Sequence, residues 1–207
     1  MAAGAASGDA VVVKAVLDDA IALHRSVRDG DHGAVIAAAA AIRGSFASGG
    51  KLLIFGNGGS AGDAQHFATE LVVRFERERA ALPALALSAD TSVVTAAAND
   101  YGFDRVFARQ IEALGRPGDV AFGISTSGGS ANVLRGIEAA NARGLRTIAL
   151  TGRDGGAVGP AAAVHINVPG DSTARVQEVH RTLLHVLCTL LERTWLEAGS
   201  GKPGAGS

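Results

Sequence analysis

The sequence is poor in aromatic residues, which make up 4% of its 207 residues, although 47% of the chain is hydrophobic. An aliphatic core rich in alanine is therefore expected. With charged residues at 19%, the chain is too apolar to remain disordered. Its length suits a single domain.

The chain also has no surplus of basic charge, because 19 basic residues are balanced by 20 acidic ones. A general electrostatic attraction to nucleic acid or to anionic membranes is thereby excluded. The sequence contains no run of about 18 apolar residues, so no membrane-spanning helix is predicted. Any phosphorylated ligand must be held by a local site.

Cysteine is nearly absent, and the single residue, Cys188, excludes an internal disulfide. Cys188 falls in a predicted helix and is expected to act as a small buried hydrophobe. Residues 1–8 lack the basic start of a signal peptide. These features together predict a cytoplasmic protein.

Helical segments and strand-length apolar runs follow one another in a regular order. Two helices open the chain, over 9–29 and 31–50, with Asp31 as the N-cap of the second. The strand-length runs are 52–55, 84–87, 120–124, 147–150 and 164–168. Helical segments are predicted at 61–75, 91–98, 104–114, 131–143 and 174–197.

This alternation is typical of an α/β fold with a parallel sheet covered by helices on both faces. The prediction is one domain over 1–197, followed by a flexible, glycine-rich tail over 198–207. Ligands of such sheets bind beyond the carboxyl ends of the strands. Clusters of glycine and serine occur at those ends in this sequence.

The first cluster, GNGGSAGD over 56–63, lies between a predicted strand and a predicted helix. Its glycines allow the backbone to approach a ligand, and Ser60 is a candidate helix cap. Neither the Walker motif nor the dinucleotide-binding fingerprint is present. An anion site at the helix start and an ordinary tight turn both remain open on this evidence.

The second cluster, STSGGS over 125–130, contains four hydroxyls and two glycines before the predicted helix at 131–143. Capping that helix requires only one hydroxyl. The other three favour a phosphate site built from neutral donors, namely hydroxyls and backbone N–H groups.

Four segments together resemble the sugar isomerase (SIS) family: GNGGSAGDAQHFATEL, ANDYGFDRVFARQ, GISTSGGSANVL and VQEVHRTLLHVL. Within that family the chain is most similar to the bacterial sedoheptulose-7-phosphate isomerases. The resemblance implies a five-stranded parallel sheet flanked by helices. It also implies a homotetramer with active sites at subunit contacts, one zinc ion per site and a phosphorylated seven-carbon sugar as substrate.

The resemblance also assigns site residues at matching positions. The phosphate loop is expected to use Ser125, Thr126, Ser127 and Ser130. Further substrate-binding residues are expected to be Asn57, Ser60, Asp100 and Gln177. The expected metal ligands are His66, Glu70, Gln177 and His185, with Glu70 and His185 also acting as the acid–base pair.

Local spacing supports only part of this assignment. His66 and Glu70 are four residues apart on a predicted helix and therefore share one face, as a chelating pair would. Gln177 lies about 80° from His185 and about 60° from His180 around the last helix. Periodicity does not choose between the two histidines, and the resemblance selects His185. His180 is expected to be a packing or interface residue, and a role in supporting the metal ligands stays open. On local sequence, Asp100 is better suited to capping the turn before Gly102, and only the resemblance gives it a role in the site.

Two alternatives to a heptose isomerase stay open from the sequence. One is a non-catalytic SIS protein that binds sugar phosphates or regulates replication initiation, and the other is an isomerase of a different phosphosugar. Gly129 and Ala174 depart from the residues usual in the resembled family, which affects substrate positioning. The charged segment 74–79 is expected to be a solvated face.

Overall fold

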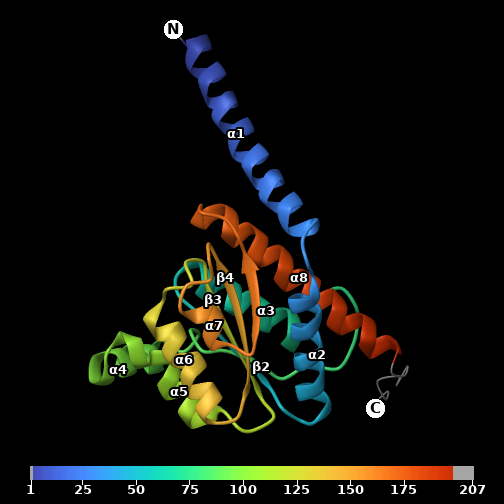
Figure 1. The fold of residues 1–207 in the computed structure, drawn as a ribbon, viewed down its shortest axis with the longest axis vertical. Helices are drawn as coiled ribbons and strands as arrows, with labels where there is room; N and C mark the ends of the chain where they lie inside the picture. Colours follow the sequence, from blue (N-terminus) through green and yellow to red (C-terminus); the bar gives the residue numbers. More distant parts are fainter. Residues whose placement is uncertain (1, 198–207) are drawn as a thin grey trace, which may run out of the picture.

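The chain folds around one five-stranded parallel sheet (Figure 1). The computed structural model describes residues 2–197, so the tail predicted over 198–207 lies outside the described residues. The strands are β1 (Leu52–Gly56), β2 (Ala84–Ala86), β3 (Val120–Ser125), β4 (Arg146–Gly152) and β5 (Val164–Val168). Their order is β2-β1-β3-β4-β5, and every pairing is parallel. The predicted α/β fold class is confirmed.

The helices follow the predicted segments closely. They are α1 (Ala2–Arg28), α2 (Gly33–Ala47), α3 (Gly59–Val72), α4 (Thr91–Tyr101), α5 (Val106–Leu114), α6 (Ala131–Ala142), α7 (Val158–Ala161) and α8 (Thr173–Glu197). A 3₁₀ turn, η1 (Phe103–Arg105), precedes α5. Only the single turn α7 and η1 have no separate counterpart among the segments predicted from the sequence.

Alternating side chains of the strands build two cores, one on each face of the sheet. Leu52 and Ile54 of β1 point to a cluster closed by α2, α3 and α8. Leu53 and Phe55 point to the opposite cluster, closed by α4, α5, α6 and α7. The helices α3 and α8 therefore lie on the same face of the sheet, where they pack against each other.

Two predicted helix caps are wrong. Asp31 is not the N-cap of α2, because the helix starts later, after His32, although the Asp31 carboxylate accepts a hydrogen bond from the Gly33 N–H at 3.0 Å. Ser60 does not cap α3. That helix begins at Gly59, two residues before the predicted start, and Gly58 holds the cap position with a φ of +53°, which glycine tolerates. Ser60 lies buried in the first turn.

Helix α1 extends well beyond the body of the molecule (Figure 1). Six of its large apolar side chains are exposed between 43% and 69% in this single chain, namely Val11, Val12, Val13, Val16, Leu17 and Ile21. An apolar groove of about 790 Å³ lies at its C-terminal half, between α1, α2 and α8. Among the described residues, no helix is long and apolar enough to cross a bilayer.

Candidate functional site

The two glycine–serine loops lie side by side because β1 and β3 are neighbouring parallel strands. The side-chain amides of Asn57, after β1, and Asn132, in the first turn of α6, exchange two hydrogen bonds of 2.7 and 2.8 Å. This reciprocal pair ties the first loop to the second. Asn132 is buried and has no distinctive sequence signal, so the sequence analysis missed it.

The 125–130 loop is held together by its own hydroxyls. The Oγ atoms of Ser125 and Ser130 lie 2.9 Å apart, and the Ser127 Oγ accepts a hydrogen bond from the Gly129 N–H at 3.2 Å. Ser130 occupies the N-cap position of α6 without bonding to its backbone. Because no side chain caps this helix start, its N–H groups are available to an anion.

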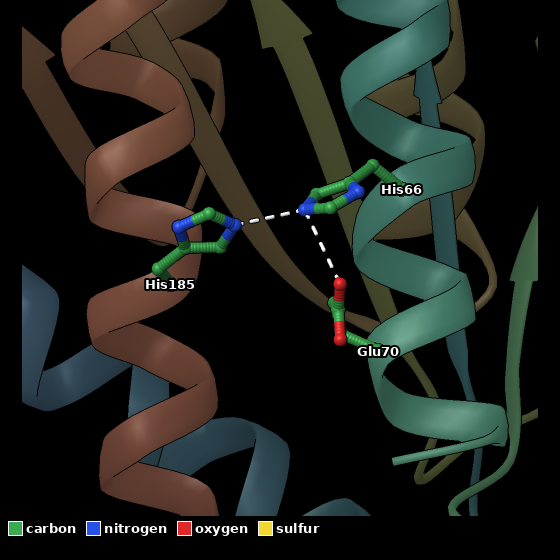
Figure 2. Close-up of side chains that lie close together, drawn as sticks. All are labelled: His66, Glu70 and His185. Atoms are coloured by element: carbon green, nitrogen blue, oxygen red, sulfur yellow. Dashed lines mark hydrogen bonds and ion pairs between the residues drawn. The ribbon is translucent and has the colours of Figure 1, made fainter. Parts of the chain in front are cut away.

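A second group of predicted residues meets across the α3–α8 contact (Figure 2). The Nε2 atoms of His66 and His185 are 2.8 Å apart, and Glu70 Oε1 is 3.4 Å from His66 Nε2. One ligand atom from each of the three residues lies within 4.8 Å of the others, so the group can hold a metal ion. All three are partly buried, and the Phe75 ring lies 5.3 Å from the His185 ring.

Gln177 lies on α8 two turns before His185, and both residues line one open hollow of about 640 Å³. The Gln177 amide nitrogen donates to Asp63 Oδ2 at 3.4 Å. This orientation leaves the amide oxygen as the atom that Gln177 can offer to a ligand.

Asp63 and Arg181 form an ion pair that the sequence analysis missed. The guanidinium donates to the fully buried Asp63 carboxylate at 2.6 and 3.0 Å, linking α8 to α3. Asp63 lies one helical turn before His66, so this ion pair forms next to the His66, Glu70 and His185 group.

The charged segment 74–79 is not simply a solvated face, because the side chain of Arg79 is only 5% exposed. Its Nε lies 3.3 Å from the buried carboxylate of Glu192, and its guanidinium donates to the Glu70 backbone carbonyl at 2.5 Å. Glu192 also accepts hydrogen bonds from the N–H groups of Phe75, Glu76 and Arg77. Because its neighbours in the sequence are charged and exposed, the burial of Arg79 could not be predicted from the sequence.

His180 is a packing residue, as predicted. It is fully buried, and its Nε2 donates to the Thr151 carbonyl at 2.9 Å. Burial lowers the pKa of His180, against the opposing effects of that hydrogen bond and of Asp63. His180 is therefore a neutral core histidine.

Asp100 lies apart from the other predicted site residues. It is exposed near the end of α4 and accepts a hydrogen bond from the Asn99 side chain at 2.8 Å. It lines a different hollow, between α4 and α5, together with Tyr101 and Arg109. Asp100 is not among the residues that line the hollow of Gln177 and His185.

Comparison with known proteins agrees with this geometry. Residues 16–152 match the family described as SIS domain. The chain is 54% identical to the phosphoheptose isomerase of Roseiflexus sp. over 79% of this chain and 83% of that protein. It is 59% identical to the phosphoheptose isomerase of Geotalea daltonii, over 70% and 76% of the two chains.

A solved structure gives the same result in three dimensions. The phosphoheptose isomerase GmhA from Neisseria gonorrhoeae superimposes with a TM-score of 0.82 at 43% identity, covering 87% of this chain and 97% of that one. The similarity thus extends over most of this chain and nearly all of the other. The chain belongs to the SIS family and, within it, to the phosphoheptose isomerases.

Proposed function

We propose that this chain is an aldose–ketose isomerase that converts D-sedoheptulose 7-phosphate into D-glycero-D-manno-heptose 7-phosphate. One observation carries the proposal: a carboxylate and two imidazoles from α3 and α8 converge within 4.8 Å in a member of the phosphoheptose isomerases. The reaction moves one proton between adjacent carbons through an enediol. It requires an acid–base pair and a clamp for the phosphate.

The phosphate is assigned to the 125–130 loop. The hydroxyls of Ser125, Thr126, Ser127 and Ser130 and the uncapped start of α6 supply neutral donors there. Asn57 and Ser60, at the adjacent β1 loop, are assigned to the sugar. Binding at the phosphate end orients the carbonyl end for proton transfer.

Proton transfer is assigned to Glu70 and His185. The Glu70 carboxylate removes a proton from the carbon beside the ketone and returns it to the former carbonyl carbon. His185 donates a proton to the carbonyl oxygen and accepts one from the neighbouring hydroxyl. The carbonyl and the neighbouring hydroxyl thereby exchange positions, and no group leaves the sugar.

His66, Glu70 and His185 are also assigned, with Gln177, to a zinc ion. The donor set fits, since two imidazole nitrogens and a carboxylate oxygen are common zinc ligands, and the free amide oxygen of Gln177 is a weaker fourth. When bound, zinc supplies Lewis-acid polarisation of the sugar carbonyl.

A homotetramer with sites between subunits is part of the same proposal. The exposed apolar side chains of α1 need a cover of comparable size, which further copies of the chain supply. A site completed between subunits also accounts for Asp100, which lies apart from the α3–α8 group in one chain. A cytoplasmic location suits a phosphorylated substrate and the free thiol of Cys188.

The experiment is a turnover assay on sedoheptulose 7-phosphate with metal analysis of the same sample. Purified protein is expected to form the aldose and to contain bound zinc. Chelator-treated protein is expected to lose turnover and regain it with zinc. Absence of turnover in the metal-loaded protein would overturn the function. Unchanged turnover after complete removal of metal would instead overturn only the catalytic role of zinc.

A further inference from the structure

The 125–130 loop rests on the turn that follows β4. Gly128 has a φ of +65°, and a Cβ built at this residue would lie 2.2 Å from the carbonyl oxygen of Gly155. The Val158 N–H donates to the Gly128 carbonyl at 2.9 Å. The two backbones are therefore in direct contact, and the position of the loop depends on that turn.

The 153–158 turn packs against the imidazole ring of His165, which lies on β5. A Cβ at Gly155 or Gly159 would lie 2.5 or 2.3 Å from His165 Cε1, so the ring fills the space beneath both glycines. A rotation of this ring would push directly on the turn. The orientation of the His165 ring therefore affects the position of the 125–130 loop, which the ring does not contact.

Thr151 fixes that orientation. Its Oγ1 lies 2.6 Å from His165 Nε2 and donates to Asn167 Oδ1 at 2.8 Å. A hydroxyl has one proton to donate, so the Thr151 oxygen must accept a hydrogen bond from His165 Nε2–H. The neutral tautomer protonated on Nε2 satisfies this bond, and burial lowers the pKa of His165, which favours the neutral ring.

Two further contacts connect Thr151 to the loop. Asn167, held by the Thr151 hydroxyl, donates from Nδ2 to the carbonyl of Arg153 at 2.9 Å. Arg153 begins the turn and has a φ of +53°, a conformation that a residue with a Cβ adopts only when its surroundings impose it. Thr151 itself is fully buried and pairs with Ser125 in the β3–β4 register.

We propose that Thr151 and His165 are positioning residues that set the affinity of the 125–130 loop for phosphate. Neither belongs to the predicted substrate-binding set. Both act through the 153–158 turn, which packs against Gly128. The inference rests on the proposed function, because it takes the loop to be the phosphate site of the isomerase.

The first test is the isosteric substitution Thr151→Val, which removes the hydroxyl and keeps the shape. We expect the dissociation constant of inorganic phosphate, measured by calorimetry, to rise about fivefold, the factor that corresponds to one net hydrogen bond. The KM for sedoheptulose 7-phosphate should rise by the same factor, with kcat changed less than twofold. Thr151→Ser keeps the hydroxyl and should restore wild-type values.

Thr147 provides a matched control on the same strand. It is also fully buried, donates to Asn141 Oδ1 at 2.9 Å and accepts from the Ala163 N–H at 2.9 Å. Its hydroxyl therefore has the same kind of partners at the opposite end of β4. Thr147→Val should lower stability about as much as Thr151→Val while leaving phosphate affinity and KM unchanged.

Substitutions at His165 keep the test decisive if Thr151→Val fails to fold. His165→Gln retains a donor and is expected to bind phosphate more tightly than His165→Leu. Wild-type phosphate affinity in His165→Leu would overturn the inference, as would wild-type affinity in folded Thr151→Val or an equal loss of affinity in Thr147→Val. Wild-type protein that neither binds phosphate nor turns over the substrate would overturn the proposed function, and the inference with it.

Discussion

The fully buried carboxylate of Asp63 is paired with the half-exposed guanidinium of Arg181, and this pair joins the two helices that carry the candidate metal ligands. The two partners differ in burial, with side-chain exposures of 0% and 48%. The side chain that remains after one partner is removed is therefore in a very different environment in the two cases. A free Arg181 can be hydrated where it stands, whereas a free Asp63 is a buried charge.

We expect Arg181→Ala to destabilise the fold more than Asp63→Asn. Leaving a buried charge unpaired costs about 3 kcal/mol or more, while losing the pair but keeping a hydrated arginine costs about 1 kcal/mol. Urea unfolding at matched chain concentrations measures both. The double variant should have about the same free energy of unfolding as Asp63→Asn. An equal loss of stability in the two single variants would contradict the claim that Asp63 is the buried partner.

Glu70→Gln tests the proposed base with almost no change in shape. Turnover is expected to fall about 10²- to 10⁴-fold, the range for loss of a general base, with KM changed only a few-fold. The measurement is steady-state kinetics together with the metal content of the variant. Glu78→Gln, at an exposed carboxylate on the segment after α3, is the control and should keep wild-type turnover. Retention of wild-type kcat in Glu70→Gln would remove Glu70 from the mechanism.

Cys188 is expected to resist alkylation in the native protein. Burial, followed by the charges of Glu70 and Glu192, raises the pKa of its thiol to about 12, and only the thiolate reacts. Iodoacetamide at pH 8 should leave the native chain unmodified by mass spectrometry and should modify it fully in urea. Native labelling at the rate of a small free thiol would show that this part of α8 is open.

We expect the buried His180 to make the fold less stable in mild acid. Burial lowers its pKa in the folded protein, so below about pH 6.5, the usual value for histidine, the unfolded chain binds a proton that the folded chain does not. The free energy of unfolding therefore falls as the pH drops, by at most about 1.4 kcal/mol per pH unit for this group.

His180→Gln keeps a donor for the Thr151 carbonyl and removes this titration. The slope of unfolding free energy between pH 5 and pH 6.5, measured by urea denaturation, should be smaller in that variant. Identical slopes for the wild-type protein and His180→Gln would show that His180 does not control acid stability.

Local sequence carried enough information for the layers of the fold and for the loops. Apolar runs such as 52–55 form strands because a sheet covered on both faces buries every side chain of its inner strands. Helix boundaries were predicted less well. Ser60 was assigned as a cap by residue type alone, whereas Gly58 takes that position because the backbone there needs a positive φ.

Pairings between elements were beyond local sequence. The four-residue spacing of His66 and Glu70 placed both on one face of α3, but it did not say which histidine of α8 would meet them. Figure 2 shows that His185 does. His180 is instead fully buried and donates to the Thr151 carbonyl on β4. The Asn57–Asn132 amide pair and the burial of Arg79 by Glu192 depend in the same way on contacts between distant segments.

The sequence by itself determined the parallel α/β architecture, the position of the two loops at strand ends and the histidine–glutamate pair, because each follows from residues close together in the chain. The tertiary structure decided which α8 histidine completes that pair, which charges are buried and which turn supports the 125–130 loop. Those outcomes depend on the packing of α3 against α8 and of the 153–158 turn against the 125–130 loop. Packing between segments that are distant in the chain leaves no periodic signal in the sequence.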